Sequence, residues 1–286
     1  MSILEAVTLG IVQGLTEFLP ISSTAHLRVV PALLGWQDPG AAFSAVIQCG
    51  TLAAVCVAMR RDIAAILSAT LETLRTGRWP TTPAARAGLF IVVGTVPIVV
   101  AGLAFKDFVK GPLRSLESVT TALLAATAAM AAAEWVAWRR GRRGAPARDG
   151  IEALSWADCL AMGSAQALAL VPGTSRSGIT IATGMLGGLD RRTAARFSFL
   201  LSLPAIAAAA VLELVEERQA ILGSPEAITA AVWGTLTAAL VGYAAIRWLL
   251  RMLTSHTLWP FIAYRIALAG LLAWSLASGL VPATTG

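Results

Sequence analysis

The chain has 286 residues, of which 57% are hydrophobic and 13% are charged, and its mean hydropathy is +0.73. A soluble domain carries about 25% charged residues, so this chain lacks the polar surface that a water-exposed fold needs. The composition excludes a soluble enzyme, a nucleic-acid-binding domain and a disordered protein. It predicts an all-α polytopic membrane protein. The formal net charge of +6 indicates no nucleic-acid partner, because most cations lie between apolar stretches.

The first half, residues 1–138, opens with an apolar region over about 3–30 that is interrupted by Glu17, Pro20 and a polar SSTAH run. It lacks a basic n-region and a clear cleavage site, so we expect it to belong to the fold. Spanning helices need about 20 mostly apolar residues. Stretches that meet or approach this length follow at about 39–59, 87–105 and 118–133, and an amphipathic, interfacial helix is predicted over 62–76.

A basic connector, 139–150, with the sequence RRGRRGAPARDG, separates this half from the second, residues 151–286. The second half again opens with an interrupted apolar region, about 159–189, which is broken by Pro172 and a polar GTSRSG run. Three further spans are predicted at about 197–212, 227–246 and 266–286. Both interruptions occupy corresponding places, and Gly10 and Gln13 correspond to Gly163 and Gln166 at an offset near 153 residues. The pattern indicates an internal repeat.

The positive-inside rule predicts how the repeat is oriented. If the basic residues around 60–86, 139–148 and 191–196 are cytoplasmic, Lys106, Lys110 and Arg114 lie outside, and both termini are extracytoplasmic. The two halves then have opposite topology. Inverted repeats with broken apolar segments are typical of transporter-like folds and point to a central site. We therefore expect two re-entrant helix–loop–helix hairpins that meet tip to tip at that site.

Ionisable groups inside apolar membrane segments are functional candidates, and here they gather at the two interruptions. Glu17 and His26 belong to the first and Arg176 to the second. A guanidinium can hold phosphate oxygens bidentately, and backbone N–H groups turned inward by Gly173 and Gly178 can add to an anion site. Hydroxyls surround these groups, so the cluster suits a phosphate ester: Ser22, Ser23, Thr24, Thr174, Ser175, Ser177 and Thr180.

Each candidate also has a structural interpretation. Arg176 could pair with Glu17 as an intramembrane ion pair, and His26 could be a hydrogen-bonded interior histidine. Gln13 lies one helical turn before Glu17 and could form a hydrogen bond that joins two membrane helices. Hydroxyls in membrane helices usually bond backbone carbonyls, so we do not expect every one to touch a ligand.

The motifs resemble those of the undecaprenyl-diphosphate phosphatase family, also called bacitracin-resistance proteins. The matching residues are Gln13-Gly-Leu-Thr-Glu17, the following Ser-Ser-Thr-Ala-His26 and the later Pro172-Gly-Thr-Ser-Arg-Ser-Gly-Ile-Thr180. They resemble the family patterns (E/Q)xxxE, SSTxH and PGxSRSxxT, and the similar layout runs through the whole chain. Gln13 stands where many members have Glu, and Ala25 stands where Gly is commoner.

The resemblance implies an enzyme of the bacterial plasma membrane that converts undecaprenyl diphosphate to the monophosphate carrier for cell-wall synthesis, with its pocket facing outward. By position, Glu17, Ser23, His26 and Arg176 match the family's essential residues. The expected mechanism has Arg176 and the PGTSRSG backbone clamping the diphosphate, and a divalent cation, Mg²⁺ or Ca²⁺, held partly by Glu17. Ser23 attacks phosphorus while His26 or Glu17 takes its proton. Direct attack by water stays open, and so does the oligomeric state, with a homodimer as one option.

A polyprenyl-phosphate flippase is the competing class, because it would use the same anion clamp without breaking a bond. Inverted repeats favour a transporter in general. A pure carrier, however, needs the arginine but neither a nucleophile nor a proton acceptor, and Glu17, Ser23 and His26 cluster here. The sequence therefore favours the phosphatase.

Overall fold

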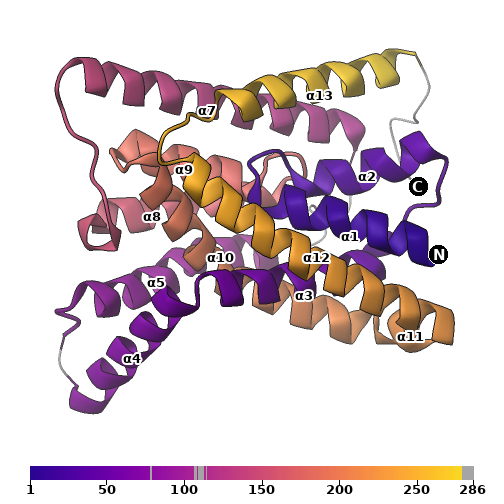
Figure 1. Ribbon diagram of the computed structural model, residues 1–286, viewed down its shortest axis with the longest axis horizontal. Coiled ribbons are helices and arrows are strands. Elements are labelled where there is room, and N and C mark those ends of the chain that lie inside the picture. Colours follow the sequence, from indigo (N-terminus) through magenta and orange to yellow (C-terminus); the bar gives the residue numbers. More distant parts are fainter. Residues whose placement is uncertain (78, 106–107, 109–112, 114, 279–286) are drawn as a thin grey trace.

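The computed structural model describes residues 1–77, 79–105, 108, 113 and 115–278, and these residues form helices and connecting loops (Figure 1). Five of the described helices are long and apolar enough to cross a membrane: α5 (Pro83–Ala104), α7 (Leu116–Arg142), α10 (Arg191–Glu216), α12 (Pro225–Met252) and α13 (Trp259–Ala277). A sixth is gained if the bent pair α3 (Gly40–Ala58) and α4 (Arg60–Thr76) counts as one span. The prediction of a helical polytopic membrane protein is confirmed.

Both interrupted apolar regions form a helix, a break and a second helix. The first comprises α1 (Ile3–Phe18) and α2 (Ser23–Leu34), and the second comprises α8 (Trp156–Ala167), the short η3 (Leu168–Leu170) and α9 (Arg176–Gly187). Serine capping boxes open α1 and α8, whose first residues are 153 positions apart. The bounds of α9 also follow those of α2 by 153 residues, and left-handed glycines end both helices.

Close helix packing places these broken pairs against full-length helices. In Figure 1, α12 runs along α1, whereas α8 lies against α5 on the other side of the molecule. Glycine makes the approach possible, since a side-chain carbon on Gly10 would come within 2.5 Å of the Gly234 carbonyl oxygen. Gly163 of α8 would meet the Gly94 carbonyl of α5 at the same distance. Small residues at such crossings let backbones pack without side chains between them.

The largest hydrophobic cluster of the described residues lies around α9 and α10. Ile181 and Met185 of α9 pack with Phe197 and Phe199 of α10, and Phe18 at the end of α1 joins them. Phe18 and Phe199 meet edge to face with ring centroids 5.5 Å apart. The end of α1 is therefore held against the second half of the chain.

Two predicted boundaries are wrong. Helix α7 continues through Arg142, so the first four residues of the predicted connector 139–150 are helical. Arginine is a good helix former, and Arg139 and Arg142 each lie over a tryptophan one turn earlier, at 5.0 and 5.2 Å from the ring centroids. Helix α13 begins at Trp259 rather than 266, because the Arg265 guanidinium is buried among carbonyl groups.

The remaining predicted segments agree with the structure in type and differ at their ends. The helices near 39–59, 62–76, 87–105, 197–212 and 227–246 are present, and most extend into flanking polar residues, because helix length exceeds the uncharged stretch that identified them. Lys106, Lys110, Arg114 and residues 279–286 of the predicted last span lie outside the described residues.

The part of the connector that is not helical is tied to the second broken pair. Arg148 donates two hydrogen bonds to the Asp158 carboxylate of α8, at 2.8 and 2.7 Å, and another to the Gly187 carbonyl at the end of α9. The hydrogen bonds to Asp158 raise the pKa of the Arg148 guanidinium above its ordinary value. Both ends of the α8–α9 unit are thus anchored to one loop.

Candidate active site

The first break spans four residues, Leu19 to Ser22, between α1 and α2. Pro20 supplies no backbone N–H to continue α1, and the Ile21 N–H turns back to the Leu19 carbonyl at 2.7 Å. Ser22, the N-cap of α2, has a φ of +77° and a ψ of 98°. Left-handed backbone of this kind is uncommon for residues other than glycine and concentrates at functional sites.

The second break repeats this conformation with different residues. Ser175, the N-cap of α9, has a φ of +68° and a ψ of 104°. Its hydroxyl accepts a hydrogen bond from the Gly178 N–H at 3.3 Å, whereas Ser22 makes no capping bond. Gly173 has a φ of +96°, and a side-chain carbon there would meet the Val119 carbonyl oxygen of α7. The backbone of this break therefore requires glycine at 173.

The two breaks contact each other directly, as the sequence predicts. The Gly173 N–H donates to the Thr24 hydroxyl at 3.2 Å, and the Ser177 hydroxyl donates to the Leu19 carbonyl at 3.2 Å. Each bond joins residues about 150 positions apart in the chain. The N-terminal ends of α2 and α9 are consequently held together, and the polar side chains of both breaks share one small region.

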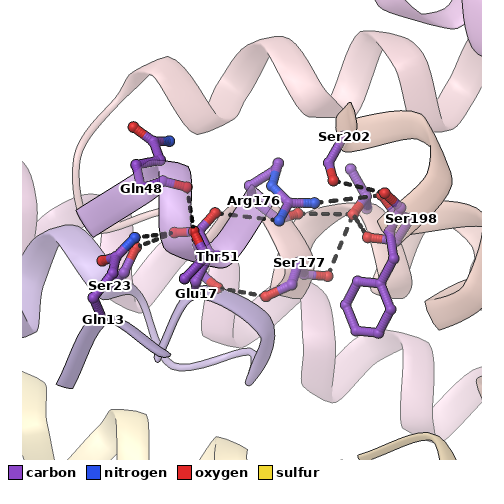
Figure 2. Close-up of polar contacts among 12 residues, drawn as sticks. Gln13, Glu17, Ser23, Gln48, Thr51, Arg176, Ser177, Ser198 and Ser202 are labelled. Atoms are coloured by element: carbon purple, nitrogen blue, oxygen red, sulfur yellow. Dashed lines mark hydrogen bonds and ion pairs between the residues drawn. The ribbon is translucent and has the colours of Figure 1, made fainter. Parts of the chain in front are cut away.

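Glu17 lies at the centre of this region (Figure 2). One carboxylate oxygen, Oε2, accepts hydrogen bonds from Ser23 Oγ at 2.9 Å and from Gln13 Nε2 at 3.2 Å. The other, Oε1, accepts from Arg176 Nη2 at 3.3 Å, and both charged side chains are about nine-tenths buried. A carboxylate, a hydroxyl and a guanidinium from opposite halves therefore meet in a largely dehydrated space.

Arg176 forms the ion pair with Glu17 that the structural interpretation expected, but its hydrogen bonds are incomplete. Nη1 donates to the Ser198 carbonyl of α10 at 3.3 Å, and the buried Nε has no hydrogen-bond partner among the described residues. A purely structural buried arginine usually satisfies all its donors. The unpaired Nε–H leaves capacity to bind an oxyanion.

Both ring nitrogens of His26 are engaged by groups other than Ser23. Its Nδ1 lies 2.6 Å from the Ser22 carbonyl oxygen and its Nε2 lies 2.7 Å from the Tyr264 hydroxyl of α13. A carbonyl only accepts, so Nδ1 carries the proton and, in the neutral ring, Nε2 accepts from Tyr264. In this arrangement Glu17, rather than His26, is positioned to take the proton of Ser23, while His26 braces the turn at Ser22.

The other predicted phosphate contacts lie in the same region and are partly occupied by one another. Ser22 bonds Thr24 at 3.1 Å, and Ser175 lies 3.3 Å from Ser177. Thr180 bonds the hydroxyl of Ser198 at 2.6 Å and the Arg176 carbonyl at 2.8 Å. The Thr174 N–H closes a turn onto the Val171 carbonyl. These hydroxyls stiffen the two breaks, and Thr180 anchors α9 to α10.

Three residues of this region are not among those that the sequence analysis singles out. Arg265 and Tyr264 are adjacent on α13, and Ser198 lies on α10. Arg265 carried a usable signal, because it is an ionisable residue inside an apolar stretch. Tyr264 and Ser198 carried none, since neither a tyrosine nor a serine is unusual in a membrane helix.

The described residues contain no group of three or more His, Cys, Asp and Glu side chains that could hold a metal ion. The acid at the site is Glu17, and beside it the buried Oε1 of Gln13 has no hydrogen-bond partner among the described residues. Magnesium is commonly bound by one or two protein carboxylates together with substrate phosphates and water. One carboxylate and one amide oxygen fit such an ion only if the substrate supplies further ligands.

The fold and the site define a class: a helical integral-membrane protein in which two broken helix pairs join a carboxylate, a serine and an arginine below the surface. Within that class, the chain belongs to the family described as bacitracin resistance protein BacA, whose model matches residues 6–271. The recognised resemblance is therefore confirmed.

Similar proteins match along almost their whole length. The chain is 48% identical over 284 residues to a protein of Chlorobium limicola, covering 99% of this chain and 100% of that protein. It is 50% identical over 278 residues to a protein of Chlorobium phaeovibrioides, covering 97% and 98%, and 48% identical over 268 residues to one of Chlorobaculum tepidum, covering 94% and 95%. All three are named undecaprenyl-diphosphatase.

Proposed function

We propose that this protein hydrolyses undecaprenyl diphosphate to undecaprenyl phosphate and inorganic phosphate at the junction of its two helix breaks. The names of its full-length relatives support the substrate. The observation that carries the reaction is the chain of contacts from Ser23 through Glu17 to Arg176, which joins a nucleophile, a base and an anion clamp. The product returns the lipid carrier to cell-wall synthesis.

Arg176 binds the terminal phosphate. Its Nε–H is free to donate, and its Nη2 exchanges the long contact with Glu17 for a phosphate oxygen as substrate enters. The N-terminus of α9 starts at this residue, so backbone N–H groups and the helix dipole act on the same anion. Charge that develops on the phosphoryl oxygens is thereby stabilised at fixed positions.

Ser23 then attacks the terminal phosphorus through Oγ, and Glu17 Oε2 accepts the hydroxyl proton across the 2.9 Å hydrogen bond. The bond between the terminal phosphorus and the bridging oxygen breaks, and undecaprenyl phosphate leaves with the proton that Glu17 transfers to that oxygen. The Glu17 carboxylate, which is again unprotonated, then takes a proton from water, which attacks the phosphoserine and releases inorganic phosphate. Glu17 returns this second proton to Ser23 Oγ, so atoms and charge balance over the cycle.

A divalent cation is proposed as a partner of the substrate at this site. Glu17 and the Gln13 Oε1 oxygen would hold it, with the diphosphate as a further ligand. When bound, the cation would neutralise part of the negative charge of the diphosphate. Phosphate release measured with EDTA, and after adding back Mg²⁺ or Ca²⁺, tests this: activity unaffected by EDTA contradicts the proposal.

The two halves are proposed to form an inverted repeat whose site opens to the extracytoplasmic side, with both termini on that side. The equal spacing of α1 with α8 and of α2 with α9 supports a repeat, and the basic loops before α5 and after α7 support its orientation. Single cysteines at Ala145 and Ser224 provide the test in a background without Cys49, Cys56 and Cys159. A membrane-impermeant thiol reagent added to intact cells should label position 224 and spare 145.

The decisive experiment is phosphate release from undecaprenyl diphosphate by purified wild type, Ser23→Ala and Arg176→Ala. Release by wild type that disappears in both variants supports a phosphatase using this site. A folded wild type that binds the lipid but releases no phosphate, with Mg²⁺ or Ca²⁺ supplied, contradicts the proposal and favours the flippase.

A further inference from the structure

Arg265 is the largest fully buried side chain among the described residues, and it lies in the first half of α13 beside α7 (Figure 1). Its Nη1 donates to the Pro20 carbonyl at 3.4 Å. Its Nη2 lies within 3.3 Å of the Gly173 carbonyl, 3.1 Å of the Thr174 carbonyl and 2.9 Å of the Leu123 carbonyl. Its Nε donates to the Thr127 hydroxyl at 2.7 Å.

These contacts bring three separate segments to one planar group. Pro20 belongs to the first break, Gly173 and Thr174 belong to the second, and the remaining acceptors lie on α7. Carbonyls at the ends of interrupted helices have no partner within the helix and need another donor. Arg265 provides that donor to both breaks at once.

Arg265 has no acidic partner, since no carboxylate lies within ion-pair distance of it in the described part of the chain. A buried charge of this kind is costly unless hydrogen bonds satisfy it, and here carbonyl and hydroxyl oxygens do so. Together, Arg176, Arg265 and Glu17 leave the region with a positive charge. That charge favours binding of an anionic headgroup.

We propose that Arg265 is a positioning residue for the phosphatase reaction, because it sets the separation between the break that carries Glu17 and Ser23 and the break that carries Arg176. Pro20 lies three residues before Ser23, and Thr174 lies two residues before Arg176. Holding both carbonyls on one guanidinium transmits a fixed geometry to the nucleophile and the clamp. Misplacement by about 1 Å can reduce a rate on the order of 100-fold.

The catalytic part of this inference rests on the proposed function, so two independent readouts are needed. The first is steady-state phosphate release by Arg265→Gln, Arg265→Lys and the control Arg191→Gln, which removes the ion pair between the partly exposed Arg191 of α10 and the buried Glu134 of α7, away from both breaks. For Arg265→Gln we expect kcat to fall on the order of 100-fold with KM changed less than about threefold. Arg265→Lys keeps the charge but cannot reach all the acceptors, so its kcat should lie between the kcat of wild type and that of Arg265→Gln.

The second readout is amide hydrogen exchange by mass spectrometry, which needs no turnover. Arg265→Gln should speed exchange in both breaks and the first residues of the helices that follow them, 19–26 and 171–178, by at least about tenfold relative to Arg191→Gln. If Arg265→Gln does not fold, Thr127→Val serves instead, because it removes one acceptor and should speed exchange severalfold in both breaks. A rise in one break only, or equal to that of the control, overturns the inference.

The two readouts separate the possible failures. Wild type without phosphate release, combined with faster exchange in both breaks of the variant, contradicts the proposed function and leaves the bridging role of Arg265 intact. An active wild type whose Arg265→Gln variant loses kcat only in proportion to its folded fraction overturns the positioning role.

Discussion

The two helix breaks share a backbone and differ in the chemistry they carry. Ser22 and Ser175, 153 residues apart, have φ values of +77° and +68° with ψ values of 98° and 104°, and each precedes a 12-residue helix. At the same offset, Ser23 corresponds to Arg176 and Glu17 to Leu170. The shared backbone ends one helix and starts another inside the protein, whereas the side chains differ, so the proposed reaction draws on both halves.

The division leaves each half incomplete. The helices on either side of the first break carry the carboxylate and the hydroxyl, and the helix after the second break carries the guanidinium. Gln13 and Gln166 illustrate the consequence, because Gln13 donates to Glu17 while both amide atoms of the fully buried Gln166 lack a partner among the described residues. Both halves therefore have glutamine at this position, but only Gln13 contacts a charged side chain.

The largest expected effect comes from removing one member on each side of the junction. Ser23→Ala removes the nucleophile and Arg176→Ala removes the fixed cation, so each should lower kcat/KM for phosphate release by at least about 1,000-fold. The double variant should be no worse than the worse single variant, because both act in one step. Multiplicative losses would show that the two breaks act independently.

Glu17→Gln should have the next largest effect. It keeps the size of the side chain and the contact with Ser23 but removes the proton acceptor, and general bases contribute about 100- to 10,000-fold. We expect kcat to fall by about 100-fold or more. Leu170→Gln, at the corresponding position of the second half, is the matched control. A Glu17→Gln variant as active as that control would exclude Glu17 as the base.

Substitution of the two repeated glutamines should have opposite outcomes. Gln13→Leu removes a hydrogen bond to Glu17 and a candidate cation ligand, so phosphate release should fall about tenfold. Gln166→Leu replaces a buried polar group without a partner by an apolar one of similar size. It should leave activity unchanged and stabilise the protein by about 1 kcal/mol. Activity assays and thermal unfolding followed by tryptophan fluorescence distinguish the two, and a destabilised Gln166→Leu would contradict this.

The smallest effect concerns the left-handed serines. Glycine tolerates this backbone, so Ser22→Gly should raise stability by about 1 kcal/mol. Both variants lose one contact between hydroxyl groups, but Ser175→Gly also loses the bond from the Gly178 N–H, which offsets the relief, so it should be nearly neutral. Thermal unfolding of both variants in the same detergent measures the difference. Equal changes would mean that the cap at Ser175 does not stabilise α9.

Much of the fold follows from residue order. Local signals in the sequence include the apolar stretches and the capping serines of α1 and α8. They also include the two prolines, Pro20 after α1 and Pro172 in the second break. The end of α7 and the start of α13 do not follow from the sequence, because charged residues that a hydropathy pattern places outside a membrane helix are helical here. Stacking on Trp135 and Trp138 and burial of Arg265 among carbonyls are contacts that a linear pattern does not contain.

The sequence by itself determined that the protein is a helical membrane protein, that it contains two interrupted segments, and which residues of those segments are candidates for binding and cleaving a phosphate ester. Tertiary structure alone decided that Glu17 faces Ser23 while His26 faces Tyr264, and that Arg265 joins the two breaks. The physical reason is distance along the chain. Helix periodicity and composition act over a few residues, whereas the contacts of His26 with Tyr264 and of Arg265 with the two breaks join residues 91 to 245 positions apart and depend on how whole helices pack. The Glu17–Ser23 contact joins residues six positions apart, but it crosses the turn between α1 and α2, where helix periodicity does not apply.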